Sequence, residues 1–349
     1  MSSNWQDQFG SNPGLFPHLM DLATDQVLIS QITEEGFRQA SFLDQRIVTP
    51  QLPRQLVQWD ELSALDCPAQ SQPQYIFHIG HVGSTLISRL LGEIDAIFAL
   101  REPQLLRNLS ELAQAFAREN SSWTVETYEA RLSEVVCWLS RSFHAHQRVM
   151  IKTSSFVSEI ADRLLQNGAS ALFLYVPLHR YLPTILAGEN SIKETGALLE
   201  SRLQRLERRI GSMPGEARDL TVAQQVAASW LCEIVTLFEA KNTSATNDIK
   251  WLNFDDFLAA PKEQLLAIAG HFGHDLEDGQ AASLVAGPIM SSYSKAPEHD
   301  YSPNLREELL VEASQIHAAE IENAMLWINE LADRFPLIAS AMQWIETER

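Results

Sequence analysis

The sequence predicts a three-layer α/β fold, in which helices cover both faces of a mostly parallel central sheet. Short apolar runs typical of buried strands recur at residues 75–79, 96–100, 148–152, 171–176 and 249–254. Longer segments with apolar residues at three- and four-residue steps, typical of buried helix faces, separate these runs. Continuous apolar strands alternating with helices indicate a parallel sheet buried on both faces.

Three segments carry the helical pattern most clearly. Residues 127–143 and 221–240 repeat apolar side chains at helical spacing, so we expect their aromatic residues in the core. Ser302 and Pro303 form a helix-entry signal, and a long helical pattern follows it to the C-terminal region. We therefore expect a helical C-terminal region.

Residues 1–70 differ in composition from the rest of the chain. They contain five prolines and one amphipathic stretch, at 31–47. We expect an N-terminal extension packed on a main domain of residues 71–349, and a separate module is the alternative.

The charge balance excludes several classes of partner. The net charge is −19, from 26 basic and 45 acidic residues. A general nucleic-acid or membrane-surface role is disfavoured because either polyanion would be repelled at long range. The N-terminus lacks a basic start followed by an apolar run, and no stretch approaches the roughly 20 apolar residues of a membrane span. We expect a cytoplasmic protein whose anionic ligand occupies a local basic pocket.

The cysteines predict neither a disulfide framework nor a zinc site. Cys67, Cys137 and Cys232 are odd in number, lie far apart, and include no CxxC pair.

A glycine-containing turn follows the first predicted strand and precedes a helical segment. Gly80 and Gly83 permit backbone conformations that turn successive N–H groups toward an anion. Ser84 and Thr85 add hydroxyl donors where the helix begins. This turn predicts a phosphate cradle, and the alternative is a turn whose glycines serve only tight packing.

The turn is not that of a common nucleoside-triphosphate site. A GxxxxGK[ST] loop places lysine directly before Ser or Thr, whereas here Gly83 directly precedes Ser84. Nucleoside-triphosphate sites also have a metal-binding aspartate at the end of an apolar strand. No such aspartate is evident here, since Pro177 follows the strand at 171–176. Both observations disfavour an ATPase or kinase.

The turn resembles the loop of the sulfotransferase family, whose members have a P-loop NTPase-like fold and transfer a sulfuryl group from 3′-phosphoadenosine-5′-phosphosulfate (PAPS). The family loop reads P-[KR]-[ST]-G-[ST]-[ST]-[LW]. In this chain Gly80 replaces the proline and His81 the basic residue, as in a divergent, bacterial-type member. The resemblance implies that the 5′-phosphosulfate is bound by Gly80, His81, Val82, Gly83, Ser84 and Thr85.

Two further segments, 151–180 and 249–273, resemble the family in the expected order, so the resemblance spans about residues 74–305. Lys152, at a strand end, matches the family lysine that stabilises charge on the transferring group. A lysine point charge suits such an anion, although an isolated lysine at a strand end is also commonly just solvated. In the later segment we expect Asp255 and Asp256 to cap a helix.

Glu102 is the candidate general base. It follows a predicted strand end and matches by position the catalytic glutamate of the protein-tyrosine branch of the family. A carboxylate there would accept the proton of an acceptor hydroxyl. The alternative is that Glu102-Pro103 merely begins a helix. His81 is a second catalytic candidate that could donate to the sulfate, with His78 ranked below it.

The cations near the turn are candidates for phosphate neutralisation. Arg101 is preferred to Arg89, because Arg89 lies on a helix whose other face is core.

The segment that matches the family's 3′-phosphate site departs from the family pattern. Sulfotransferases place an arginine after the strand and a serine eight residues later. One register here gives Val176 and Thr184, and another gives Arg180 and Gly188. Arg180, Thr184 and, from a later polar loop, Lys295 are the resulting donor-binding candidates.

The resemblance implies sulfuryl transfer from PAPS to a small-molecule or macromolecular hydroxyl or amine, without a metal. Two alternatives stay open: a P-loop small-molecule kinase using ATP, and a non-enzymatic P-loop-like binding or scaffold protein. The sequence is compatible with a homo-oligomer.

Overall fold

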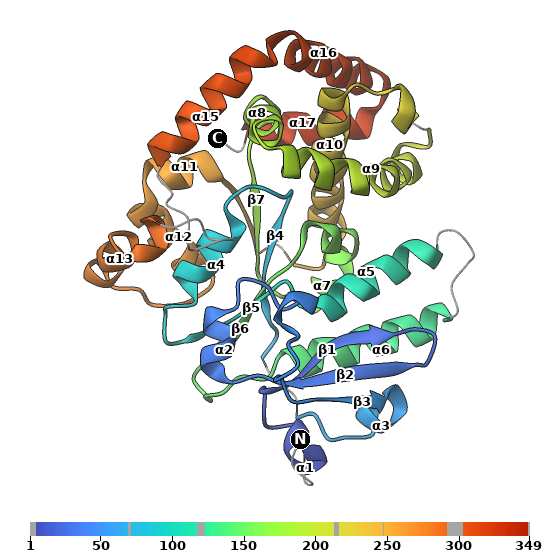
Figure 1. Cartoon of the computed structure of the whole chain (residues 1–349), viewed down its shortest axis with the longest axis vertical. Coiled ribbons are helices and arrows are strands. Elements are labelled where there is room, and N and C mark those ends of the chain that lie inside the picture. The colour runs from blue at the N-terminus through green and yellow to red at the C-terminus, as the bar shows by residue number, and fades with distance from the viewer. Residues whose placement is uncertain are drawn as a thin grey trace.

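The computed structural model describes residues 5–68, 71–116, 123–212, 216–246, 248–291 and 303–347. Its centre is a parallel five-stranded sheet in the order β5-β6-β4-β7-β8 (Figure 1). The strands are β4 (Gln74–His78), β5 (Ile97–Arg101), β6 (Arg148–Lys152), β7 (Ala171–Tyr175) and β8 (Ile249–Asn253). All five predicted strands are confirmed.

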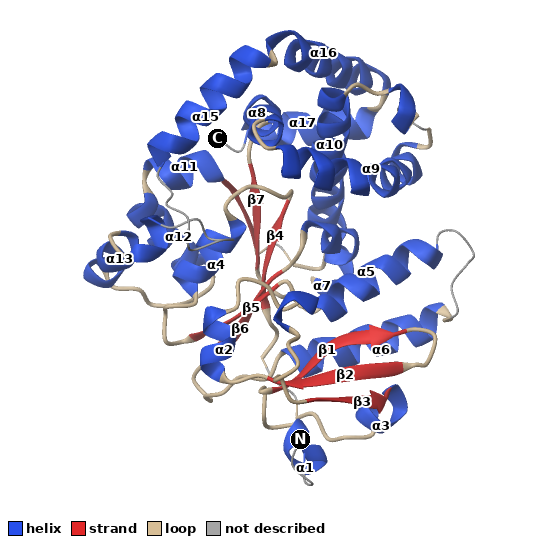
Figure 2. Ribbon diagram, in the orientation of Figure 1, coloured by secondary structure: helices blue, strands red, loops and turns tan. Residues whose placement is uncertain are grey.

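Helices cover both faces of this sheet, which confirms the predicted three layers. On one face, α4 (Ser84–Leu91) contacts β4, β5 and β6, with α12 (Pro261–His271) packed on it. On the other face, η2 (Ser155–Ile160) contacts β4 and is covered by α10 (Val222–Thr243). Figure 2 shows the strands between these two groups of helices. Because both faces are covered, Tyr75, Phe77 and Phe173 are fully buried.

The N-terminal residues form a second, antiparallel sheet of β1 (Leu15–Asp21), β2 (Gln26–Gln31) and β3 (Arg54–Gln58). Strand β1 packs on α5 (Gln104–Phe116) and α6 (Val125–Leu139), and the buried core continues between the two sheets. The sequence did not predict these strands. Pro17 and a register shift between Pro17 and Leu19 interrupt the alternation of side chains in β1.

The remaining helices complete the chain. They are α1 (Trp5–Phe9), α2 (Glu34–Gln39), η1 (Gln45–Ile47), α3 (Trp59–Ser63), α7 (Ala161–Leu164), α8 (Leu178–Leu186), α9 (Glu189–Ile210), η3 (Ala217–Asp219), α11 (Phe254–Ala259), α13 (Asp278–Val285), α14 (Pro288–Ser291), α15 (Pro303–Ile316), α16 (Ala318–Arg334) and α17 (Pro336–Thr347). Helices α8 and α15 contact each other beyond the upper ends of β4 and β7 in Figure 1. The predicted helical C-terminal region is divided at His317, whose backbone leaves the helical conformation.

A disulfide joins Cys67, in the segment before β4, to Cys137 on α6. The sequence prediction of no disulfide was wrong here. The two cysteines are 70 residues apart, and only the packing of the N-terminal sheet on α6 brings them together.

Candidate active site

The glycine turn forms a tight loop between β4 and α4. Gly80, His81 and Gly83 have φ values of 88°, 55° and 67°, in the left-handed region. At Gly83 no larger residue fits, because a Cβ atom would lie 2.0 Å from the Phe254 ring. The glycine therefore serves two purposes, since it sets the loop conformation and admits Phe254 against it.

The N-terminus of α4 has the features of an anion site. The first-turn N–H groups of a helix have no intrahelical acceptor and carry the positive end of the helix dipole. Ser84 and Thr85 begin this helix and are buried. Within the described part of the chain, the buried Thr85 hydroxyl has no hydrogen-bond partner. An anion at the helix terminus would supply the acceptor that this hydroxyl lacks.

His78 fixes the start of the loop. Its Nδ1 accepts from the Gly80 N–H at 3.0 Å, and its Nε2 lies 2.8 Å from the Thr153 carbonyl oxygen. Since a carbonyl only accepts, Nε2 carries the proton and the imidazole is neutral. The Gly80 N–H is thereby engaged within the protein, so anion donors must come from later in the loop.

Lys152 and Glu102 form an ion pair beside this loop. Strands β5 and β6 are in register at Arg101 and Lys152, and the Glu102 N–H donates to the Lys152 carbonyl at 2.6 Å. The Lys152 ammonium donates to Glu102 Oε1. The Lys152 side chain is 1% exposed and that of Glu102 is 18% exposed. The structure thus brings together the predicted charge-stabilising lysine and the predicted base, with the carboxylate on the open side.

Backbone strain is concentrated at this site. Among the described non-glycine residues, Asp25, His81 and Glu102 have positive φ, at 52°, 55° and 54°. Asp25 lies in the β1–β2 turn, where such a conformation is common. The other two are catalytic candidates named from the sequence. Strain of this kind costs about 1–3 kcal/mol per residue and often accompanies function.

Several contacts connect the loop to the ion pair. The Thr153 N–H donates to the Ile76 carbonyl at 3.0 Å, so the residue after Lys152 lies against β4. His81 Nε2 lies 3.5 Å from Glu194 Oε2 on α9. We call the loop, the Lys152–Glu102 pair and Glu194 together the transfer site.

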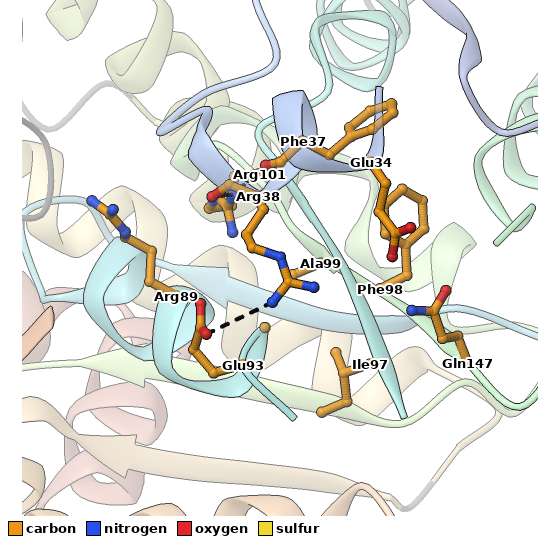
Figure 3. A pocket seen from close by; sticks show the side chains of 11 residues that line it. Glu34, Phe37, Arg38, Arg89, Glu93, Ile97, Phe98, Ala99, Arg101 and Gln147 are labelled. Atoms are coloured by element: carbon orange, nitrogen blue, oxygen red, sulfur yellow. Dashed lines mark hydrogen bonds and ion pairs between the residues drawn. The ribbon is translucent and has the colours of Figure 1, made fainter. Parts of the chain in front are cut away.

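Arg101 lies elsewhere. Its guanidinium donates to the carbonyl oxygens of Phe37, Arg38 and Ala40, and burial lowers its pKa to about 10. Figure 3 shows it lining a small cavity together with Arg89 and Glu93, at the C-terminal end of α4. The phosphate cradle is at the opposite end of that helix. Arg101 therefore anchors α2, contrary to the role in donor binding expected for it.

The candidates for a second phosphate have protein partners. Arg180 pairs with Asp255 at 2.8 Å and with both carboxylate oxygens of Glu307 at 3.0 and 2.5 Å. These contacts, the one to Glu307 foremost, raise the pKa of Arg180. The Thr184 hydroxyl donates to the Arg180 carbonyl at 2.7 Å, within α8. Lys295 lies outside the described residues.

Neither Asp255 nor Asp256 caps the helix, contrary to expectation, since both lie in the first turn of α11. Asn253 accepts from the Asp255 N–H at 3.0 Å and is the cap of α11, which leaves the Asp255 carboxylate for Arg180 and for Arg306 at 2.8 Å. Arg306 in turn lies over the Phe254 ring that packs on Gly83. The ion pairs of α15 thus reach the neighbourhood of the loop.

Three side chains near the loop were not singled out from the sequence. A Cβ atom at Gly80 would lie 3.8 Å from both Ser155 Oγ and the Tyr181 hydroxyl oxygen. Arg202 Nη2 is 3.4 Å from Ser155 Oγ. The Ser154-Ser155 pair, which begins two residues after Lys152, is a local signal that could have indicated Ser155.

No helix in the described ranges has both the length and the apolar character needed to cross a membrane. No group of three or more His, Cys, Asp or Glu side chains in those ranges could hold a metal ion.

Comparisons with known proteins give a consistent but weak likeness. No protein-family model matches the sequence, and no curated protein matches it significantly. Similar solved structures include the sulfotransferase domain from the curacin biosynthetic pathway, at 11% identity and a TM-score of 0.38 over 72% of this chain and 99% of that one. They also include a sulfotransferase from Alicyclobacillus acidocaldarius, at 13% identity and a TM-score of 0.36 over 72% of this chain and 96% of that one. A third is the sulfotransferase domain of the Synechococcus PCC 7002 olefin synthase, at 14% identity and a TM-score of 0.37 over 72% of this chain and 97% of that one. The chain is similar to sulfotransferases, at values too low to carry an argument about its chemistry.

Proposed function

We propose that this protein is a sulfotransferase that moves a sulfuryl group from PAPS to a hydroxyl or amine acceptor. The observation that carries the proposal is the buried Lys152–Glu102 pair beside the loop, with both Glu102 and His81 held in a strained conformation. The sequence resemblance assigns roles to the same residues independently of this geometry.

The donor's 5′-phosphosulfate would bind at the N-terminus of α4. The first-turn N–H groups and the hydroxyls of Ser84 and Thr85 are its donors, and Lys152 and His81 offset the charge that develops on the transferring group. Hydrogen-bond donors and cations of this kind stabilise developing charge without a metal.

In the transfer step, an acceptor oxygen or nitrogen attacks sulfur in line. The bond between sulfur and the bridging phosphate oxygen breaks, and adenosine 3′,5′-bisphosphate leaves. Glu102 accepts the proton of the acceptor. For this to occur Lys152 must share or exchange its contact with Glu102, and the arriving phosphosulfate is the anion that would draw it away.

Arg180 is our candidate for the donor's 3′-phosphate. A phosphate there would have to replace the Glu307 carboxylate, which now occupies the same guanidinium edge. This engagement is also the observation that favours the scaffold alternative, because a permanently paired Arg180 would leave the donor without its second anchor. The kinase alternative has only the general P-loop-like fold in its favour, since the loop lacks the lysine of a nucleoside-triphosphate site.

Thermal-shift measurements with adenosine 3′,5′-bisphosphate, ATP plus Mg²⁺, and sulfate would separate the three functions. A ligand at 100 times its Kd stabilises the native state by about 2.7 kcal/mol. We expect the bisphosphate to raise the melting temperature most. A larger shift with ATP plus Mg²⁺ would support a kinase, and sulfate binding without bisphosphate binding would support a scaffold.

A matched pair of variants locates the site. Thr85→Val keeps the side-chain shape and removes the hydroxyl, so bisphosphate affinity should fall about 5- to 10-fold. Ser88→Ala is the control, because Ser88 lies one turn further along α4 and is equally buried. An equal effect of both substitutions would contradict the assignment of the cradle.

A further inference from the structure

Part of the N-terminal extension is built into the transfer site. The Leu43 N–H donates to the Arg101 carbonyl at 2.7 Å, and the Leu43 carbonyl accepts from the Gln104 N–H at 3.1 Å. These two hydrogen bonds lie on either side of Glu102 in the chain. The segment from Phe42 to Arg46 therefore helps to hold the strained Glu102 backbone.

The Phe42 ring in this segment contacts two cations, Arg46 and Lys152. Arg46 Cζ is 3.6 Å from the ring centroid, and Lys152 Nζ is 5.7 Å from it. The ring itself is buried. Arg46 is thus stacked on a fixed aromatic platform that also borders the Lys152–Glu102 pair.

Asp44 fixes the orientation of the Arg46 guanidinium. Arg46 Nε donates to Asp44 Oδ1 at 2.8 Å, and Nη2 donates to Oδ2 at 2.5 Å. Asp44 also accepts from the Arg46 backbone N–H at 2.9 Å, and its own carbonyl oxygen lies 2.9 Å from His18 Nε2. Asp44 therefore holds the guanidinium from its Nε side, and the contact with His18 fixes the Asp44 backbone.

The other edge of the guanidinium belongs to a side chain that is more than half exposed. Arg46 Nη1 has no hydrogen-bond partner among the residues that the structure describes, and the side chain is 56% exposed. A guanidinium presents donors on two edges, so Asp44 leaves the Nη1–Nη2 edge for another oxyanion. Because orientation is already fixed, binding there loses less side-chain freedom than at an ordinary surface arginine.

We propose that Arg46 determines acceptor specificity by binding a carboxylate or a similar oxyanion on the acceptor molecule. This inference rests on the proposed sulfuryl transfer. The Phe42 ring contacts both the Arg46 guanidinium and the Lys152 ammonium that donates to Glu102. An acceptor anchored at Arg46 therefore presents its hydroxyl or amine to Glu102. The acceptor is an acid that carries a nucleophilic hydroxyl or amine at the far end.

Transfer of labelled sulfuryl from PAPS to ω-hydroxy carboxylic acids of increasing chain length, each paired with its primary amide, tests the inference. The wild type should use the best acid about 10-fold better than its amide in kcat/KM, as expected for one partly exposed charged contact. Arg46→Gln should remove this preference through KM, and Arg46→Lys should restore part of it. Affinity for adenosine 3′,5′-bisphosphate should be unchanged in both variants.

Arg54→Gln is the control, since Arg54 is an exposed arginine on β3 whose guanidinium, among the residues described, donates to the Thr49 carbonyl alone. It should keep the preference for acids. Equal use of acid and amide by the wild type, or an acid preference that survives in Arg46→Gln, would overturn the inference. So would bisphosphate binding without transfer to either series. Failure of the wild type to bind the bisphosphate at all would instead overturn the proposed function on which the inference rests.

Discussion

Two buried ion clusters in this protein differ in how completely their charges are satisfied. The first joins Arg205 on α9 to Glu233 on α10 and Glu159 in η2. The second is the Lys152–Glu102 pair at the ends of β6 and β5. Both lie mostly in the interior, and the most exposed side chain of the two clusters is that of Glu102, at 18%.

In the first cluster, called here the helix cluster, every edge of the Arg205 guanidinium is used. Arg205 donates to Glu159 at 2.7 Å, to both oxygens of Glu233 at 3.0 and 3.1 Å, and to Ser158 Oγ at 2.9 Å. Arg205 and Glu233 are both 0% exposed. Burial on its own would raise the pKa of Glu233, and Arg205 and Arg202 lower it. A cluster saturated in this way orders three elements and leaves no group for a ligand.

The Lys152–Glu102 pair has the opposite character. The described residues provide the Glu102 carboxylate with one hydrogen-bond donor, Lys152, and its backbone is strained. The comparison suggests the hypothesis that completeness of hydrogen bonding, more than burial alone, distinguishes a structural ion pair from one that can take part in the proposed reaction.

The largest expected effect is on stability, in the helix cluster. Glu233→Ala would leave Arg205 and Arg202 as buried charges with fewer partners, so the free energy of unfolding should fall by about 3–5 kcal/mol. Glu102→Gln should lower it by less, because Glu102 is partly exposed and the glutamine amide oxygen can still accept a hydrogen bond from the buried Lys152 ammonium. Urea denaturation of both variants checks this difference, and equal losses would remove the distinction between the clusters.

The helix cluster should also control acid unfolding. Burial would raise the pKa of Glu159, but Arg205, Arg209 and Arg208 outweigh it and lower the pKa from 4.5 to about 2. A carboxyl with a depressed pKa stabilises the fold above its unfolded pKa and loses that contribution as the pH falls through its folded pKa. Stability should therefore decline from about pH 4.5 to about pH 2 by ~3 kcal/mol from this group.

Glu159→Gln checks the sign of this effect. The variant should be less stable at neutral pH and should show a flatter decline below about pH 4.5 than the wild type in pH-dependent denaturation. A decline as steep as that of the wild type would assign acid sensitivity to other carboxyl groups.

The smallest expected effect concerns the carboxylates that occupy Arg180. Glu307→Gln weakens an ion pair that a donor phosphate would have to replace, so affinity for adenosine 3′,5′-bisphosphate should rise about 3- to 10-fold. Glu308→Gln is the control, being an exposed neighbour on the same helix. Calorimetric titration measures both, and a fall in affinity with Glu307→Gln would place the 3′-phosphate elsewhere.

The sequence predicted the parts of the fold that depend on local pattern. The five central strands are continuous apolar runs, and the loop from Gly80 to Thr85 is a contiguous signal between a strand and a helix. The position of Glu102 beside Lys152 was not itself predicted, since it depends on β5 pairing with β6. The sequence did suggest that Lys152 lies at a strand end and that Glu102 directly follows one. The carboxyl ends of parallel strands lie at the same edge of a sheet.

The parts that were missed depend on long-range packing. The Cys67–Cys137 disulfide, the burial of Arg101 under α2, and the position of Arg46 near the Lys152–Glu102 pair all depend on how the N-terminal residues pack on the rest of the chain. The local patterns in the sequence do not specify these long-range contacts. Arg101 was expected to neutralise phosphate. Instead it donates to backbone carbonyls at the C-terminal end of α2, where carbonyl groups have no intrahelical donor.

Transfer of labelled sulfuryl from PAPS by the wild type and by Glu102→Gln tests the central claim most directly. Glutamine keeps the size of the side chain but removes its basicity, so we expect bisphosphate affinity to persist while turnover falls by about 10²–10⁴-fold. Lys152→Ala, measured alongside, should reduce both affinity and turnover, because a charge beside the phosphosulfate acts in the ground state as well as in the transition state. Near-normal turnover in a folded Glu102→Gln protein would contradict the assignment of the base, and absence of transfer and of bisphosphate binding in the wild type would contradict sulfuryl transfer itself.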